Sequence, residues 1–369
     1  MTKRTLKTVS VIVVLIAVIF APGTPVVAKL IKWKAATVWT PAITLIKADQ
    51  YFVKTLNELC KGELEVKLYP APQIVSSFEV FGAVQSGVVK IGFDWPGYWA
   101  GKDTAFGALG ALPCGPGQMD LMTWIIKGGG DKVAMDVFEK HGLLYFFHTV
   151  LPPESGLRGK RSFTKREDFK GAKIRMSGLF QGKILKDLGA SQVMLAGQEI
   201  YQALEKGVID AAEFSTPDND WSLGFQEVTS VWNSPGWHQP ASPMGLMVNR
   251  KAWDQLPPHI QQKFKVAATA TMAWGIAHYN YEGSLYAKKF MDKGVTVNYL
   301  DEAVMEEIQK LSYYHIVEEA EKNPTFAKVV YSMFSAMNVL TNTRDKELGL
   351  LSRQIILPDM EKLRRAATQ

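Results

Sequence analysis

The sequence predicts an α/β fold that is divided into two similar lobes. Between residues 31 and 250, strand-like segments alternate with segments of helical periodicity, which is the pattern of an α/β protein. Residues 79–89 (EVFGAVQSGVV) are echoed 120 positions later by residues 199–209 (EIYQALEKGVI). The length of 369 residues also favours two domains over one. We therefore expect one lobe over residues 29–150, completed by later segments, and a second over residues 151–250.

Residues 1–28 have the three parts of a secretory signal peptide. They comprise a basic start, an apolar stretch over residues 9–20 and small residues before an expected cleavage after Ala28. An uncleaved membrane anchor is the alternative, although about a dozen apolar residues fall short of the roughly 20 that a spanning helix needs. We therefore expect export to the periplasm.

Composition and charge exclude several classes of protein. Apolar residues make up 47% of the chain and charged residues 21%, which excludes a disordered or collagen-like protein. Residues 1–28 carry three Lys or Arg and no Asp or Glu, so cleavage lowers the net charge from +6 to +3. No basic block interleaved with aromatic residues remains, and we expect no nucleic-acid partner. Cys60 and Cys114 could form one disulfide after export, but the sequence does not show whether they meet.

The first lobe is expected to begin with an alternating strand over residues 31–37 and a helix over residues 41–60, with Pro41 in its first turn. Gly62 ends that helix. The remaining elements expected in this lobe are strands over residues 63–69, 88–93 and 143–149 and helices over residues 76–86 and 119–140.

The second lobe is expected to hold strands over residues 172–176, 192–195, 208–214 and 244–249 and helices over residues 179–188 and 199–206. After Pro257 and Pro258, apolar residues recur with helical spacing, and residues 251–369 read as helices with few strands. This region predicts a long helix that braces both lobes. Two ordinary helices, broken at Gly275 or Gly283, are the alternative.

The two echoed segments predict a cleft between the lobes. Each consists of an amphipathic helix, a glycine suited to the left-handed conformation and a β-branched strand start. Chance similarity is the alternative, because this local arrangement is common. If the echo is real, Phe93–Asp94 and Glu213–Phe214 lie at the carboxyl ends of equivalent strands, where open α/β sheets bind ligands. Two such edges facing each other form a cleft.

Several ordered motifs resemble one family of transport proteins. They are residues 174–179 (IRMSGL), residues 198–214 (QEIYQALEKGVIDAAEF), the turn Pro235-Gly236-Trp237 and residues 248–253 (VNRKAW). These segments resemble the extracytoplasmic substrate-binding proteins of tripartite ATP-independent periplasmic (TRAP) transporters. The resemblance implies a two-lobed periplasmic substrate-binding fold and a membrane permease of one small and one large subunit as partner. The resemblance does not decide whether the protein forms a homodimer.

Within that family, the chain is most similar to the branch that binds α-keto acids, lactate and related monocarboxylates together with a metal ion. The resemblance therefore implies a small organic carboxylate as ligand and a cation, Ca²⁺ or Na⁺, that bridges to its carboxylate. It implies no organic cofactor and no enzymatic activity.

Arg175 is the first candidate for binding that carboxylate. It ends an apolar strand and is followed by Ser177-Gly178 at an expected helix start, so a guanidinium and backbone N–H groups can converge on one anion. The alternative is an arginine paired with a nearby acid such as Asp187 or Asp210. Lysine would supply the charge without the planar two-point geometry.

Glu213 closes the apolar run 208–212, where an unpaired carboxylate would be costly, so something cationic should meet it. In the similar proteins an acid here is followed by tryptophan, and the acid's side chain and the next residue's backbone help to hold the metal. Phe214 stands in place of that tryptophan, which keeps a backbone carbonyl but loses any indole hydrogen bond. The resemblance thus assigns Glu213 and Phe214 to the metal and Phe214 also to the substrate.

Glu154 and Gln239 complete the metal and substrate residues that the resemblance implies. Glu154 aligns with a glutamine of the relatives and Gln239 with an acid, so acid and amide have exchanged places while the charge of the site is kept. Two carboxylates suit a hard cation with oxygen ligands better than zinc. The alternative for Glu154 is a solvated loop acid near Arg158 and Arg161.

Aromatic residues after the first-lobe strands are candidates for the wall of the cleft. Trp95, Tyr98 and Trp99 follow the first echoed strand and Trp39 follows strand 31–37. Of these we favour Tyr98 and Trp39 as substrate contacts, since such rings wall an apolar pocket and can bond one polar atom. Core packing is the alternative for each.

Enzyme motifs have little support. Gly178 to Lys183 is one residue short of a P-loop and lacks its Ser or Thr, and there is no GxSxG or HExxH. The six histidines show no metal-ligand spacing. A secreted two-lobed hydrolase and a binding protein of an ATP-driven importer remain as alternatives to the TRAP assignment.

Overall fold

The computed structural model describes residues 30–347 and 358–368. The predicted signal peptide, residues 1–28, lies outside the described residues. Within the described ranges, no helix is both long enough and apolar enough to cross a membrane.

The first sheet has five strands in the order β2-β1-β3-β10-β4. Strand β1 lies parallel to β2 and β3, whereas β10 pairs antiparallel with both β3 and β4. The four strands predicted in the first lobe all form. The bounds are β1 (Ile31–Thr37), β2 (Leu64–Tyr69), β3 (Ile91–Asp94), β4 (Leu143–Leu151) and β10 (Ser242–Asn249).

Three predictions for this lobe need correction. The first helix, α1 (Ile46–Leu59), begins five residues late, and Pro41 lies in the turn before it rather than in its first turn. The helix expected over residues 119–140 is two helices, because Gly129 adopts a left-handed φ of 88° between them. The strand expected at 244–249 is β10, which was placed with the second lobe but lies in the first sheet. The helices of this lobe are α1, α2 (Val80–Gln85), α3 (Ala105–Gly110), α4 (Gln118–Ile126) and α5 (Gly130–Glu139), with short 3₁₀ turns η1 (Ser77–Glu79) and η2 (Pro96–Trp99).

The second sheet has six short strands in the order β11-β9-β5-β8-β6-β7. The predicted segments supply β6 (Lys173–Arg175), β7 (Ser191–Val193) and β8 (Ala211–Ala212). Strands β5 (Leu157–Gly159), β9 (Val231–Ser234) and β11 (Thr296–Tyr299) were not predicted. The helices and turns of this lobe are η3 (Arg166–Phe169), α6 (Leu179–Asp187), α7 (Gly197–Glu205), α8 (Pro217–Ser222) and α9 (Phe225–Val228).

Besides the long helical connection from β10 to the second sheet, the chain passes between the two sheets through two neighbouring crossover segments. One joins β4 to β5 and the other joins β9 to β10. The backbone N–H of Glu154 in the first segment donates to the carbonyl of Gln239 in the second at 3.1 Å. These segments connect both lobes and lie side by side, so residues on them belong to the boundary between the lobes.

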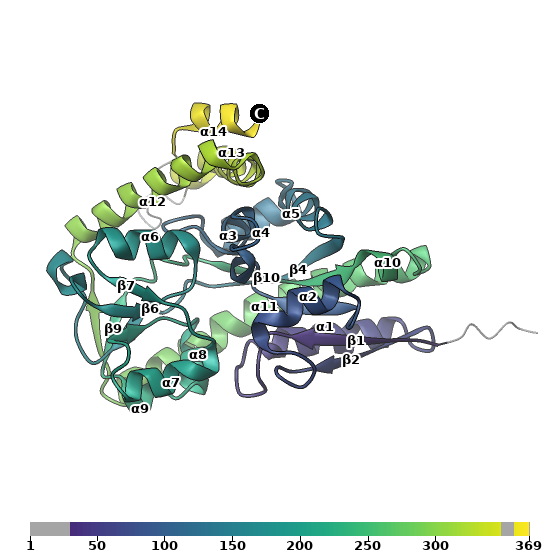
Figure 1. The fold of residues 1–369 in the computed structure, drawn as a ribbon, viewed down its shortest axis with the longest axis horizontal. Helices are drawn as coiled ribbons and strands as arrows, with labels where there is room; N and C mark the ends of the chain where they lie inside the picture. The colour runs from purple at the N-terminus through teal and green to yellow at the C-terminus, as the bar shows by residue number, and fades with distance from the viewer. Residues whose placement is uncertain (1–29, 348–357, 369) are drawn as a thin grey trace, which may run out of the picture.

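A single helix, α11 (Pro258–Asp292), runs along both lobes (Figure 1). It packs against β4 and α1 of the first lobe and against α8 of the second. A Cβ at Gly275 would stand 2.3 Å from Thr149 Oγ1 of β4, so glycine permits the close approach. The prediction of a long bracing helix is confirmed over the alternative of a break at Gly275 or Gly283. The remaining helices are α10 (Arg250–Trp253), α12 (Glu302–Lys322), α13 (Pro324–Glu347) and α14 (Met360–Ala367).

Cys60 and Cys114 do not form a disulfide with each other. Cys60 is buried in a cluster of the first lobe with Phe52 and Leu56. Cys114 packs against a separate cluster of the second lobe that includes Leu157. The open question of whether the two cysteines meet is thus answered by their packing in different cores.

Asp94, the last residue of β3, is buried and hydrogen-bonded. It accepts from the indole N–H of Trp99 and, at 3.0 Å, from the hydroxyl of Tyr145. Burial raises the pKa of Asp94 to about 8. An unfolded aspartate has a pKa of about 3.9, so the folded state favours the protonated form. This contribution to stability is fully present below about pH 4 and is lost as the pH rises toward about 8.

We expect Asp94→Asn to weaken the fall in melting temperature between pH 5 and pH 8.5. Asparagine mimics the protonated carboxyl and carries no charge at any pH, so the cost of ionising a buried group disappears. Differential scanning calorimetry across this range measures the effect. The exposed Asp136→Asn variant should follow the wild-type profile, and parallel profiles for Asp94→Asn and wild type would contradict the assignment.

Candidate ligand-binding site

A small enclosed cavity lies where the two lobes and the crossover segments meet. Its first-lobe wall is aromatic and apolar, its second-lobe wall carries Ser177, Phe214 and Ser215, and Glu154 and Gln239 come from the crossover segments. The structure therefore brings together five of the predicted site residues, which lie on five different parts of the chain. The lining residues are Trp39, Leu45, Trp95, Tyr98, Glu154, Ser177, Phe214, Ser215, Gln239 and Met244.

Arg175 and Glu213 lie together behind this cavity at one edge of the second sheet. Strands β6 and β8 are parallel neighbours with Arg175 opposite Ala212, which places the two side chains at the same edge. The Nη1 of Arg175 donates to Glu213 Oε1 at 2.9 Å and to the Glu213 carbonyl at 2.7 Å. Both side chains are fully buried. The cationic partner expected for Glu213 is therefore Arg175 itself.

The guanidinium of Arg175 is held mainly by the protein. Its Nε and Nη2 both donate to the carbonyl of Leu195, at 3.1 and 3.0 Å. Nε and Nη2, the pair of donors that could bind a carboxylate through two parallel hydrogen bonds, are thus engaged within the protein. In this conformation they are not available for a bidentate contact with a ligand. Neither Asp187 nor Asp210, the two acids considered as alternative partners of Arg175, pairs with it. Asp187 bonds His315 instead, and Asp210 accepts from the backbone N–H of Lys173.

The two oxygens of the Glu213 carboxylate differ in their surroundings. Oε1 accepts from Arg175 and from both the backbone N–H and the hydroxyl of Ser177. Oε2 is buried and has no hydrogen-bond partner among the described residues. It lies 3.8 Å from His238 Nε2. An unbonded buried carboxylate oxygen is costly, so this position favours a positively charged ligand.

Glu154 approaches the same point from the first crossover segment. Its Oε2 lies 3.0 Å from His238 Nε2, and its Oε1 lies 3.1 Å from the Ser242 hydroxyl. The side chain is buried, and burial together with the negative charge of Glu213 raises the pKa of Glu154 well above its usual value. The alternative of a solvated loop acid is therefore wrong. Arg158 pairs with Asp220 and Arg161 bonds the carbonyl of Asp168.

His238 is a site residue that the sequence analysis missed. Its Nε2 lies between the carboxylates of Glu154 and Glu213, and the three candidate ligand atoms all lie within 4.8 Å of one another. Burial lowers the pKa of its imidazole, and the charge of Glu213 opposes that shift. The histidines were set aside because they lack a regular spacing in sequence. The available signal was the adjacency of His238 to Gln239, which was already predicted at the site.

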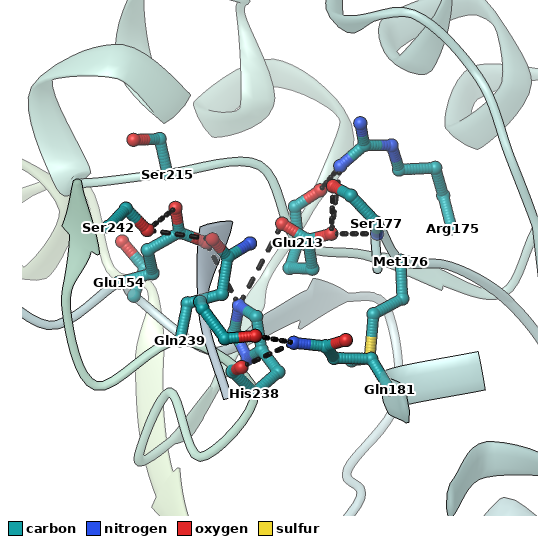
Figure 2. A network of polar contacts seen from close by, with 12 residues as sticks. Glu154, Arg175, Met176, Ser177, Gln181, Glu213, Ser215, His238, Gln239 and Ser242 are labelled. Atoms are coloured by element: carbon teal, nitrogen blue, oxygen red, sulfur yellow. Dashed lines mark hydrogen bonds and ion pairs between the residues drawn. The ribbon is translucent and has the colours of Figure 1, made fainter. Parts of the chain in front are cut away.

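The crossover segments are fixed by amide and hydroxyl contacts (Figure 2). The Ser242 hydroxyl lies 2.7 Å from Gln239 Oε1, and Gln181 Nε2 of α6 donates to the carbonyl of His238 at 2.8 Å. Ser242 therefore connects Glu154 to Gln239, and Gln181 ties the His238 loop to the second lobe. Figure 2 shows the carboxylates of Glu213 and Glu154 converging on the same nitrogen of His238.

The aromatic wall joins the two lobes across the cavity. Trp39 contacts Tyr98 and Phe214, with ring centroids 6.0 and 6.4 Å apart. Burial raises the pKa of the Tyr98 phenol, and the charge of Arg175 and a hydrogen bond with it oppose the shift. The guanidinium of Arg175 lies 5.5 Å from the Phe214 ring centroid, a cation–π contact. Tyr98 and Trp39 thus line the first-lobe wall of the cavity.

The free volume of the cavity is about 10 Å³. That is room for one ion or one water-sized group. A carboxylate with a carbon skeleton needs more space, so its entry requires the first-lobe aromatic wall to move away from Ser177 and Phe214. Because these groups belong to different lobes, widening the cavity requires the two lobes to separate.

Two known proteins are similar to this chain over most of its length. A relative from Nostoc sp. (strain PCC 7120), a monocarboxylate 2-oxoacid-binding periplasmic protein, is 27% identical over 306 residues, covering 83% of this chain and 84% of the relative. The C4-dicarboxylate-binding periplasmic protein DctP of Rhodobacter capsulatus is also 27% identical, over 76% of this chain and 83% of its own length.

Two solved structures are similar over nearly their full length. A TRAP periplasmic solute-binding protein of Colwellia psychrerythraea, with bound calcium and pyruvate, has a TM-score of 0.83 and 26% identity, covering 88% of this chain and 99% of that one. A protein of Pseudoalteromonas atlantica, with bound sodium and pyruvate, has a TM-score of 0.83 and 27% identity, covering 88% and 100%. Residues 35–320 match the model of the DctP family, described as bacterial extracellular solute-binding protein, family 7. The chain belongs to this family of TRAP transporter solute-binding proteins.

Proposed function

We propose that this protein captures a small 2-oxo or 2-hydroxy monocarboxylate together with a cation and delivers it to a TRAP permease of one small and one large subunit. The observation that carries the proposal is the unbonded, buried Oε2 of Glu213, which faces Glu154 and His238 beside an aromatic cavity. The relatives whose names give a 2-oxoacid or pyruvate as ligand support the same class of solute. Export through residues 1–28 to the periplasm is part of the proposal, and homodimer formation stays open.

The donor set fits a cation. Glu213 and Glu154 supply carboxylate oxygens, Gln239 an amide oxygen and Phe214 a backbone carbonyl, as the resemblance implied. When bound, the cation would supply the positive charge that two buried carboxylates and an anionic ligand need. Arg175 keeps Glu213 in place and adds one positive charge beside it. The Tyr98 hydroxyl and Arg175 would orient the carboxylate of the ligand.

A monocarboxylate fits this cavity better than a dicarboxylate. Among the described residues that line the cavity there is no lysine or arginine, and Arg175 lies behind it with most of its donors engaged. A second ligand carboxylate would therefore be buried against an apolar wall of Trp39, Leu45 and Met244 without a cationic partner. Pyruvate-sized ligands avoid that cost.

We expect removal of bound cations to weaken pyruvate binding by about 100-fold, because the ligand carboxylate would then face Glu154 and Glu213 without an intervening positive charge. Titration calorimetry with the mature protein, before and after exhaustive chelation and dialysis against a sodium-free buffer, measures the change. Restoring divalent cation should restore affinity. Equal affinity in both preparations would show that no cation takes part.

Two alternative functions, a hydrolase and a receptor of an ATP-driven importer, can each be distinguished from the proposed one by a simple observation. A hydrolase would turn over a panel of esters and glycosides, whereas a receptor returns its ligand unchanged. A receptor of an ATP-driven importer would be encoded beside an ATPase, whereas a TRAP receptor is encoded beside a small and a large membrane subunit. We expect no turnover and no neighbouring ATPase gene.

A further inference from the structure

The imidazole of His238 lies beside both carboxylates of the proposed cation site. Its Nε2 lies 3.0 Å from Glu154 Oε2 and 3.8 Å from Glu213 Oε2. All three side chains are buried, and Glu213 Oε2 has no hydrogen-bond partner among the described residues. No other group of three such side chains converges in this way within the part of the chain that the structure describes.

We propose that His238 is a nitrogen ligand of the cation, so that Glu154, Glu213 and His238 together select a divalent transition-metal ion over Na⁺ and Ca²⁺. This inference rests on the proposed function and deepens it by naming the class of cation. It gives His238 a role that the oxygen-only set of Glu154, Glu213, Phe214 and Gln239 did not include.

The distances between the donor atoms suit a common ion. Two ligands that each lie about 2.0–2.2 Å from a metal are separated by about 3.0–3.5 Å when the angle between them is near tetrahedral or octahedral. His238 Nε2 lies 3.0 Å from Glu154 Oε2, at the lower limit of this range, and 3.8 Å from Glu213 Oε2, slightly above its upper limit. A small movement of Glu213 toward His238 would complete the set. The Ser177 and Arg175 contacts to its other oxygen would keep Oε2 directed at the site.

The donor types favour a transition-metal ion. Imidazole nitrogen is a good ligand for Zn²⁺, Ni²⁺ and related ions, and carboxylates also bind Mn²⁺, whereas Na⁺ and Ca²⁺ prefer oxygen throughout. A neutral His238 with its proton on Nδ1 presents the Nε2 lone pair to the position between the carboxylates. In the structure Nε2 lies at hydrogen-bond distance from Glu154 Oε2 and Nδ1 has no partner among the described residues, so without a cation a proton on Nε2 satisfies this contact, and a cation would take its place.

The charge balance favours a divalent ion. When a cation is bound and both carboxylates are ionised, Glu154, Glu213 and a monocarboxylate ligand contribute three negative charges, and Arg175 contributes one positive charge, which leaves two negative charges in a buried site. A divalent cation cancels them, whereas Na⁺ leaves one uncompensated. Buried uncompensated charge is strongly unfavourable.

The first test is the ion preference of the chelated mature protein. Calorimetry with Mn²⁺, Zn²⁺, Ca²⁺ and Na⁺, each with pyruvate present, should give at least 10-fold tighter binding of Mn²⁺ or Zn²⁺ than of Ca²⁺. In His238→Gln the order should reverse, with Ca²⁺ bound more tightly than Mn²⁺ or Zn²⁺. A wild-type protein that binds pyruvate as well with Ca²⁺ or Na⁺ would overturn the inference and leave the proposed function intact. Failure to bind pyruvate with any cation would overturn the proposed function.

The second test observes the ligand atom directly. Pulsed electron paramagnetic resonance of the Mn²⁺ protein should show coupling to an imidazole nitrogen. His238→Gln should lose that coupling and the exposed His259→Gln should keep it. Absence of nitrogen coupling in the wild type would overturn the assignment, whatever the stability of the variants. Pyruvate binding that survives chelation in the wild type but not in His238→Gln would instead show that the imidazolium serves as the cation, which also overturns it.

Discussion

Replacing Arg175 by lysine should lower the affinity for pyruvate by about 100-fold, or about 2.7 kcal/mol. The guanidinium donates two hydrogen bonds to the Leu195 carbonyl and two to Glu213. Lysine keeps the positive charge but cannot hold both partners at once in this planar arrangement. Glu213 would lose its fixed orientation, and the ligand carboxylate would lose the group that orients it.

Calorimetry with pyruvate and saturating divalent cation measures this loss. Arg166→Lys is the matched control, because Arg166 is exposed and pairs with Glu307 on the surface of the second lobe. That variant should bind pyruvate as the wild type does. Circular dichroism and the melting temperature of Arg175→Lys separate a binding defect from unfolding. A folded Arg175→Lys protein with wild-type affinity would remove Arg175 from the site.

Replacing Gly236 by alanine should lower the free energy of unfolding by about 3 kcal/mol and weaken pyruvate binding as well. A Cβ at this position would stand 2.1 Å from the Glu154 carbonyl and 3.2 Å from the Gly156 backbone nitrogen. Because both atoms belong to the backbone, the two crossover segments must move apart. Glu154 and His238 lie on these segments, so the displacement reaches the cation site.

Chemical denaturation gives the stability change and calorimetry the affinity change. Gly101→Ala is the matched control, because a Cβ there would meet no atom within 4 Å. That variant should keep wild-type stability and affinity. A Gly236→Ala protein as stable as Gly101→Ala would mean that the contact between the crossover segments is looser than the structure shows.

Local patterns predicted most elements of the fold correctly. Strand β1 was found because Trp33 and Ala35 alternate with exposed lysines, and α11 was found because apolar residues recur after a proline pair. The split between α4 and α5 was missed although Gly128, Gly129 and Gly130 mark it. A glycine run was a sufficient signal for that break. The helical periodicity on both sides concealed it.

Long-range pairing could not be predicted from local patterns. The sequence showed that residues 244–249 form a strand but not that they insert between β3 and β4. Strands β5, β9 and β11 were not predicted, because they have only three or four residues each, too few for a periodic signal. Their positions depend on pairing with distant segments, which only the folded chain displays.

The sequence predicted which residues lie near the candidate site better than it predicted the contacts between them. Arg175 and Glu213 were expected at one sheet edge, and β6 and β8 place them there. Their direct bond was not foreseen, because the sequence cannot show which acid a buried arginine meets. His238 was missed for the same reason, since its partners Glu154 and Glu213 come from segments 84 and 25 positions away.

A crystal structure of the mature protein grown with pyruvate and Mn²⁺ tests the central claim most directly. We predict an anomalous peak for Mn²⁺ between the side chains of Glu154 and Glu213, with the pyruvate carboxylate beside Arg175 and Tyr98 in the cavity between the lobes. An anomalous peak elsewhere, or pyruvate bound outside this cavity, would contradict the account.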